Sequence, residues 1–272
     1  MNISLPDGSV RELKTGLTGL DLANDIGPGL AKAAIAVTVN GVQKDLSDPI
    51  LEDSEVSIIT IDSDEGLEIM RHTLSAQVLA RAVKNLYPET KLAIGPTITD
   101  GFYYDFEFKE SISNENLEAI EKEMKKIISS NASITKGFHT KKEAINVFKS
   151  KGEGYKELII NESDQEDNFQ LYYQNDSDFV DLCKGPHLPS LKHIGAFKLT
   201  KLAGAYWKGD SKNKMLTRIY GTAWKNDKDL QKYITSIEEA EKRDHRKIGK
   251  ELNLFHFQEE APGMVFWHPD GW

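Results

Sequence analysis

A cysteine, a histidine and an aspartate lie within seven residues of each other in the second half of the sequence. Cys183 is the only cysteine of the chain, His187 follows four residues later, and Asp181 precedes it by two. Gly185 and Pro186 predict a turn between them, because proline fixes φ and glycine adopts conformations that other residues avoid. Such a turn presents a thiol, an imidazole and a carboxylate together, a group that can bind a metal, hold a nucleophile or position a water.

These residue types leave several kinds of chemistry open. A lone cysteine is most often a small buried apolar residue. Zinc takes about three or four protein ligands, and Cys183, His187 and His193 could supply three. With a single cysteine, a closed structural zinc site is not expected. Nucleophilic catalysis by a Cys–His pair needs the two side chains within hydrogen-bond reach, which depends on the fold.

The bulk properties of the 272 residues exclude several classes of protein. Hydrophobic residues make up 39% of the chain, and 43 acids against 34 bases give a net charge of −9. This charge argues against a surface that coats nucleic acid generally, although a local basic face can still hold RNA. A single cysteine excludes an intramolecular disulfide and fits a reducing cytoplasm. The sequence shows neither a signal peptide nor an apolar run long enough to span a membrane.

Residues 1–62 are expected to form a small α+β domain, and the region after it alternates helices and strands. A turn at Pro6-Asp7-Gly8 predicts a hairpin, and Asn40-Gly41 predicts a second tight turn. Apolar spacing and β-branched runs predict the remaining elements. The expected helices are Thr18–Asp25, Leu67–Leu86, Asn114–Ile128 and Lys141–Lys149. The expected strands are Asn2–Leu5, Ser9–Leu13, Ile35–Val39, Val56–Ile61, Leu158–Ile160, Phe169–Tyr173 and several within Lys91–Phe108.

One long charged helix is expected from Asp227 to about Asn253. Its second half is basic and includes Arg243, Arg246 and Lys247. Two interpretations stay open for this face. It is either a solvated linker surface or a contact for the phosphates of an RNA, since Lys and Arg supply the sequence-independent part of nucleic-acid affinity.

The segments around these residues resemble the bacterial threonyl-tRNA synthetases, and the resemblance covers all 272 residues. Its motifs are DFVDLCKGPH from Asp178, then AGAYWKGD, RIYGTAW, AIGP, DGFYYD, KRDHRKIG and EEAPGM. The resemblance implies an α+β chain in four parts. These are a ubiquitin-like TGS domain at 1–62, an editing (second additional) domain at 63–226, a linker helix at 227–253, and the start of a class II aminoacylation domain at 254–272.

The resemblance also implies an activity. Enzymes of this family attach threonine to its tRNA with ATP, and the editing domain hydrolyses serine wrongly attached to that tRNA. No cofactor is expected for this segment, because the ATP, Zn²⁺ and Mg²⁺ sites of the family are expected beyond residue 272. The expected partner is tRNA(Thr), with no DNA and no membrane, in a cytoplasmic protein that is a homodimer at full length. The alternative is a tRNA-binding module with weak or lost editing.

An editing site is needed because serine and threonine differ by one methyl group. A missing methylene is worth only about 1–3 kcal/mol of discrimination. The resemblance implies roles for eight residues of this sequence. Those at the catalytic positions are Cys183, His187, Lys156, Asp181 and His72, and those at the substrate pocket are Tyr103, Tyr104 and Gln77. For tRNA contact, the expected residues are the basic ones named above.

The helix that carries His72 departs from the family pattern. The family has two histidines four residues apart, which face the same way on a helix. Counting forward from His72 puts the second histidine's place at Ala76. Counting back from the well-matched Val78 puts it at Gln77, with the first at Thr73. One extra residue has therefore entered the segment, and His72 would reach the site if the helix begins after it.

Overall fold

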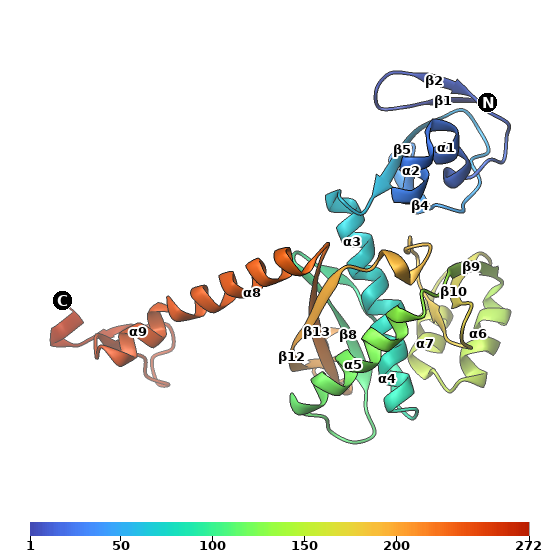
Figure 1. The fold of residues 1–272 in the computed structure, drawn as a ribbon. Coiled ribbons are helices and arrows are strands. Elements are labelled where there is room, and N and C mark those ends of the chain that lie inside the picture. The colour runs from blue at the N-terminus through green and yellow to red at the C-terminus, as the bar shows by residue number, and fades with distance from the viewer. Residues whose placement is uncertain (272) are drawn as a thin grey trace. The chain divides into compact units, whose positions relative to one another are not determined.

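The computed structural model describes residues 1–271 and divides them into two compact units. The first unit is Met1–Lys225 and the second begins at Asn226. Both units mix helices and strands, so the α+β class predicted from the sequence is confirmed. Figure 1 shows the chain as a ribbon with its elements labelled.

The first sixty residues fold around a mixed five-stranded sheet in the order β2-β1-β5-β3-β4. Its strands are β1 (Asn2–Ser4), β2 (Val10–Glu12), β3 (Ala34–Val39), β4 (Val42–Asp45) and β5 (Ser54–Thr60). The helices α1 (Gly19–Ile26) and α2 (Pro28–Ala33) lie between the second and third strands. The Thr18 hydroxyl caps α1 in a capping box with Asp21. The hairpin, helix and strands expected here are therefore present.

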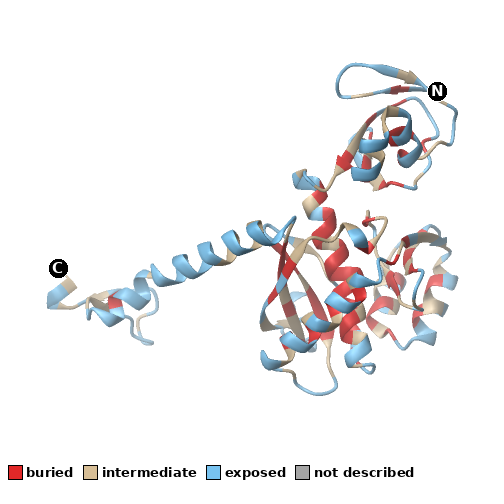
Figure 2. Cartoon of the chain, viewed as in Figure 1, coloured by how far each residue is buried: buried red, intermediate tan, exposed pale blue. Residues whose placement is uncertain are grey.

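The middle of the first unit is a sheet in the order β12-β13-β8-β6, with β7 paired to β8. Its strands are β6 (Lys91–Leu92), β7 (Thr97–Ile98), β8 (Gly101–Glu107), β12 (Ala196–Tyr206) and β13 (Met215–Trp224). A continuous helical column and the helix α5 (Glu115–Ser129) pack against this sheet. The column consists of α3 (Asp64–Thr73), the π-helical turn η1 (Leu74–Leu79) and α4 (Ala80–Leu86). It is buried along most of its length (Figure 2).

A third sheet, in the order β11-β10-β9, completes the first unit. Its strands are β9 (Ile134–His139), β10 (Phe169–Gln174) and β11 (Val180–Leu182). The helices α6 (Lys141–Ser150) and α7 (Gly154–Glu162) lie between β9 and β10 in the chain. The strand predicted at Leu158–Ile160 is wrong, because these residues belong to α7. Helix α7 buries Tyr155, Lys156 and Ile160. An apolar run as short as Leu158–Ile160 has no periodicity that distinguishes a helix from a strand. Short 3₁₀ turns, η2 (Leu191–His193) and η3 (Trp207–Gly209), flank β12.

The second unit contains two helices in place of the single one expected. Helix α8 (Asp227–Lys242) ends before Asp244, whose carboxylate caps α9 (His245–Glu251) by accepting from the Arg246 backbone at 2.9 Å. The aspartate thus starts a new helix where the charge pattern predicted a continuous one. The remaining elements are β14 (Phe255–His256), β15 (Phe266–Trp267) and η4 (Pro269–Gly271). Within residues 1–271, no helix is both long and apolar enough to cross a membrane.

Candidate functional site

The turn between Cys183 and His187 is shaped by Gly185 and by a tyrosine from the neighbouring strand. Gly185 has a φ of 68°, and a side-chain carbon at this position would lie 1.9 Å from the hydroxyl oxygen of Tyr172. Only glycine fits both conditions. The ring of Tyr172 also packs edge-on against His187, with 4.4 Å between the ring centroids. The Gly-Pro turn predicted from the sequence therefore exists, and Tyr172 holds it from β10.

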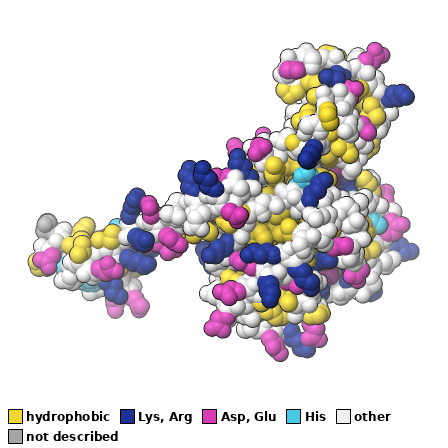
Figure 3. Space-filling model, viewed as in Figure 1, with side chains coloured by type: hydrophobic (Ala, Val, Ile, Leu, Met, Phe, Trp, Pro, Cys, Tyr) yellow, Lys and Arg dark blue, Asp and Glu magenta, His cyan; other side chains and the backbone are white. Residues whose placement is uncertain are grey.

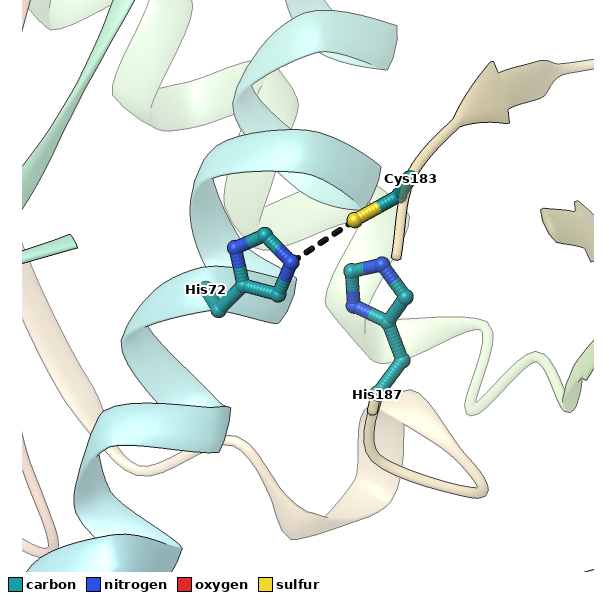
Figure 4. Close-up of side chains that lie close together, drawn as sticks. All are labelled: His72, Cys183 and His187. Atoms are coloured by element: carbon teal, nitrogen blue, oxygen red, sulfur yellow. Dashed lines mark hydrogen bonds between the residues drawn. The ribbon is translucent and has the colours of Figure 1, made fainter. Parts of the chain in front are cut away.

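His72, Cys183 and His187 form one cluster, as Figure 4 shows. The Nε2 atom of His72 lies 2.8 Å from the Sγ atom of Cys183. The two imidazole rings stack with centroids 4.6 Å apart and planes 6° from parallel. The structure thus brings together three of the residues expected at the catalytic positions, from a helix and from a loop far along the chain.

His72 reaches the cluster from inside a helix, so the condition that the helix begins after it is wrong. Helix α3 begins at Asp64, and the chain continues from His72 directly into the π-helical turn. There the Ala80 N–H bonds to the carbonyl of Ser75, five residues back. A π turn takes up one more residue than an α turn. The resemblance implies one extra residue in this segment, and a π turn is a way for a helix to hold it.

The hydroxyl of Thr73, which follows His72 in the chain, determines which ring nitrogen of His187 carries the proton. The Thr73 hydroxyl donates its one proton to the Ile69 carbonyl at 2.8 Å and accepts from Leu188 N at 3.0 Å. Nδ1 of His187 lies 3.1 Å from the same oxygen, so the proton in this contact comes from the imidazole. We therefore assign His187 the tautomer with the proton on Nδ1. Its Nε2 carries a lone pair, is buried, and has no hydrogen-bond partner among residues 1–271.

Both imidazoles are held in their neutral form near neutral pH. Burial lowers the pKa of His187 below its ordinary value of 6.5, and the adjacent Cys183 opposes this shift only in part. Burial also lowers the pKa of His72, against the opposite pull of the Asp181 charge. A neutral imidazole can accept a proton or bind a metal, whereas an imidazolium can do neither.

Lys156, Asp181 and Tyr104 form a second buried group next to the first. Lys156 Nζ lies 2.6 Å from Asp181 Oδ1, and the Tyr104 hydroxyl donates to Asp181 Oδ2 at 3.2 Å. The side chains of Lys156 and Asp181 are only 4% and 1% exposed. Burial, followed by the Asp181 charge, raises the pKa of Tyr104. A buried ion pair of this kind fixes the position of an ammonium donor, since either charge alone would be strongly unfavourable there.

Two residues expected at the substrate pocket lie elsewhere. Tyr103 points to the other face of β8 from Tyr104, and its ring stacks under the Arg218 guanidinium at 3.8 Å. Successive residues of a strand face opposite ways, so Tyr103 and Tyr104 project from opposite faces of the sheet. Gln77 is fully buried in the π turn, where its side-chain oxygen accepts from Gln174 Nε2 at 3.2 Å. Within residues 1–271, no hydrogen bond joins Gln77 to the cluster of Figure 4.

The basic residues expected to contact tRNA lie in the second unit, near the junction of α8 and α9. Arg243 pairs with Glu239 at 3.3 Å and Arg246 pairs with Asp244 at 2.7 Å. Both arginine side chains are at least 70% exposed, and exposed pairs contribute little to stability. Lys247 follows in the first turn of α9. Figure 3 shows basic and acidic side chains interspersed over the visible face.

The cluster can also supply metal ligands. The ligand atoms of His72, Cys183 and His187 all lie within 4.8 Å of one another, and three such ligands plus a water suit a zinc ion. His193, considered from the sequence as a third ligand, is not in this group. The Thr73 contact to Nδ1 leaves Nε2 of His187 free for such a bond, which is the usual arrangement around metal-binding histidines.

Comparison with known proteins places these domains. Residues 170–220 match the threonyl and alanyl tRNA synthetase second additional domain, and residues 1–60 match the TGS domain. The chain is 54% identical to the threonine–tRNA ligase of Hahella chejuensis over 270 residues, which are 99% of this chain and 42% of that protein. The chain therefore contains a TGS domain and a threonyl and alanyl tRNA synthetase second additional domain, and nearly its whole length is similar to a bacterial threonine–tRNA ligase.

Two further bacterial threonine–tRNA ligases match this chain as widely. The threonine–tRNA ligase of Prochlorococcus marinus is 52% identical over 99% of this chain, and that of Francisella tularensis subsp. novicida is 52% identical over all of it. The chain spans about two fifths of the length of these relatives, 42% in each case. The second additional domain matched at 170–220 contains Asp181, Cys183 and His187, whereas His72 joins the cluster from outside the matched range.

Proposed function

We propose that this chain carries the editing site of a threonine–tRNA ligase and hydrolyses the ester of seryl-tRNA(Thr). One observation supports this most strongly. The buried Nε2 atom of His187 has a lone pair, has no hydrogen-bond partner within residues 1–271, and lies in one cluster with Cys183 and His72. Of these three residues, Cys183 and His187 belong to the matched second additional domain. A neutral imidazole nitrogen of this kind can accept a proton from a water that reaches it with the substrate.

In the proposed reaction, a water attacks the carbonyl carbon of the seryl ester. The water gives its proton to a neutral imidazole, for which His187 is the candidate, and the bond between the carbonyl carbon and the ribose oxygen breaks. The proton passes to the departing oxygen, so the products are serine and free tRNA. General acid–base help of this kind is typically worth about 10²–10⁴-fold in rate. Lys156, held by Asp181, is the candidate donor for charge that develops on oxygen.

Cys183 need not attack the substrate in this scheme. Its Sγ atom is within hydrogen-bond distance of His72, so it can orient that imidazole and occupy the space where a substrate methyl group would lie. Excluding threonine by its methyl group requires such a filled wall, since the smaller serine then fits and the larger amino acid does not.

For the whole protein we propose the family's ligase activity, in which threonine is attached to tRNA(Thr) with ATP, Mg²⁺ and a zinc-bound threonine pocket outside these 272 residues. A cytoplasmic homodimer is the assembly proposed with it. The sequence identity to threonine–tRNA ligases of three bacteria supports this proposal.

The alternative is a tRNA-binding module that edits weakly. It is favoured by Gln77, one of the two positions at which the resemblance implies a second histidine, because this side chain binds Gln174 instead of the cluster. The contact between His72 Nε2 and Cys183 Sγ favours hydrolysis. The experiment is to incubate the chain with seryl-tRNA(Thr) and threonyl-tRNA(Thr). Faster loss of serine than the spontaneous rate, with threonine retained, supports editing, and equal loss with and without protein supports the binding module.

A further inference from the structure

A carboxylate from the N-terminal domain reaches the turn that carries His187. Asp45 ends β4, in the TGS domain, and is only 7% exposed. Its Oδ1 atom accepts the His187 backbone N–H at 2.9 Å. Its Oδ2 atom accepts the Tyr172 hydroxyl at 2.7 Å and lies 2.7 Å from Lys136 Nζ. One side chain therefore contacts the backbone of the turn and two side chains of the third sheet.

These contacts fix the backbone of His187 and one side of its imidazole. The Asp45 bond holds the backbone from which the ring projects, and the Tyr172 ring, itself anchored by Asp45, packs edge-on against the imidazole. The same Tyr172 hydroxyl lies over Gly185, where a side-chain carbon would meet it at 1.9 Å. Moving Asp45 would therefore move the turn and the ring together.

The energetics favour a rigid contact. The Lys136 side chain is 8% exposed and binds both Asp45 and Asp48 at 2.7 Å. Although burial opposes it, hydrogen bonding to these two carboxylates raises the pKa of Lys136, so the ammonium stays charged. Removing one member of a buried pair leaves an uncompensated charge, which is strongly unfavourable. Residues of β3 and β5, among them Ile35 and Ile59, also share one hydrophobic core with the helical column.

We infer that Asp45 is a positioning residue of the editing site, so that the TGS domain forms part of that site. This inference rests on the proposed editing function and extends it to a residue more than 130 positions away in the sequence from Cys183. Asp45 does not touch the substrate in this account. It keeps His187 stacked on His72 and keeps the turn closed around Cys183.

The test compares Asp45→Asn with Asp48→Asn in the full chain. Each variant removes one of the two carboxylate charges that pair with Lys136, but only Asp45 contacts His187 and Tyr172. An asparagine side chain keeps one acceptor oxygen and has an NH₂ group in place of the second oxygen, which accepts a hydrogen bond in the parent. Two readouts are used: the rate of seryl-tRNA(Thr) hydrolysis, and the rate at which iodoacetamide alkylates Cys183, which is the only cysteine.

We expect Asp45→Asn to slow hydrolysis by about 10- to 100-fold, as small displacements of reacting groups do, and to speed alkylation several-fold. Asp48→Asn should change both readouts clearly less than Asp45→Asn, because Asp48 bonds to Lys136 and to the Asp45 backbone N–H but to neither His187 nor Tyr172. Equal behaviour of the two variants in both readouts overturns the inference. If the parent does not hydrolyse seryl-tRNA(Thr), the editing proposal fails, and the alkylation rates alone decide whether Asp45 holds the turn.

A second variant covers the case in which Asp45→Asn fails to fold. Tyr172→Phe removes only the hydroxyl that donates to Asp45 and keeps the ring against His187. It should also raise the alkylation rate of Cys183, by less than Asp45→Asn. An alkylation rate equal to that of the parent overturns the inference.

Discussion

The Nε2 atom of His72 lies 2.8 Å from the Sγ atom of Cys183, although 111 residues separate them in the chain. Between His72 and α4 the helical column contains the π turn Leu74–Leu79, which holds one more residue than an α turn. Without the π turn, an insertion would rotate one end of a helix by roughly 100° relative to the other. His72 would then face away from Cys183.

The position of Gln77 predicts the effect of placing a histidine there. Gln77→His should not speed hydrolysis of seryl-tRNA(Thr), because the side chain at this position is fully buried and faces Gln174. The measurement is the single-turnover deacylation rate, with Gln77→Ala as the control for loss of the side chain. A rise of about tenfold or more in Gln77→His alone, within the range of acid–base catalysis, would show that position 77 reaches the substrate.

Gly185 should be intolerant of any side chain. Gly185→Ala should lower stability by about 1–3 kcal/mol from backbone strain, and by more because the new carbon would meet Tyr172. Gly152→Ala is the matched control, since Gly152 also has a positive φ of 70° but nothing lies within 4 Å of the added carbon. Urea unfolding measures both. Equal losses in the two variants would mean that Tyr172 does not restrict the turn.

The histidine cluster should make the protein sensitive to acid. The pKa of His187 is lowered by burial from 6.5, so between that lowered value and 6.5 the unfolded chain binds more protons than the folded one. Stability therefore falls as the pH drops below 6.5, by at most about 1.4 kcal/mol per pH unit for this one group. His187→Gln removes this contribution. Its free energy of unfolding should thus lose less than the parent's between pH 7.5 and 5.5, and an identical pH dependence would contradict the assignment.

The basic residues near the α8–α9 junction give a prediction about tRNA. Changing Arg243, Arg246 and Lys247 together to alanine should weaken tRNA(Thr) binding and reduce the salt slope by up to about 0.7–0.9 per lost phosphate contact. Binding is measured by filter retention at several salt concentrations. Three exposed lysines of α5, changed together, provide the control: Lys122, Lys125 and Lys126. A slope unchanged from the parent in the first variant would leave this face as a solvated linker.

Much of this organisation could be predicted from local sequence signals. The turn at Gly185-Pro186 and the hairpin at Pro6-Asp7-Gly8 follow from backbone preferences of single residues, and both are present. The split of Tyr103 and Tyr104 onto opposite faces was also readable, since strand residues alternate. Helix α7 was missed because Leu158–Ile160 is too short an apolar run to distinguish a helix from a strand.

The parts that could not be predicted depend on contacts between distant segments. The Thr73 hydroxyl meets His187 across 114 residues, and the Asp45 carboxylate meets the His187 backbone across 142. Threonine in a helix and aspartate at a strand end are common on any surface, so neither carries a local signal. The extra residue near His72 was visible, but a π turn, a bulge or a loss of register would all have fitted the sequence.

The central claim is that the cluster of His72, Cys183 and His187 hydrolyses seryl-tRNA(Thr). The most direct measurement is the single-turnover deacylation rate of the parent chain and of His187→Asn, with folding of both checked by circular dichroism. Asparagine can replace the Nδ1 hydrogen bond but cannot accept a proton near neutral pH. We predict that the parent hydrolyses the ester well above the spontaneous rate and that His187→Asn is slower by about 10²-fold or more. Equal rates in a folded variant would contradict the claim.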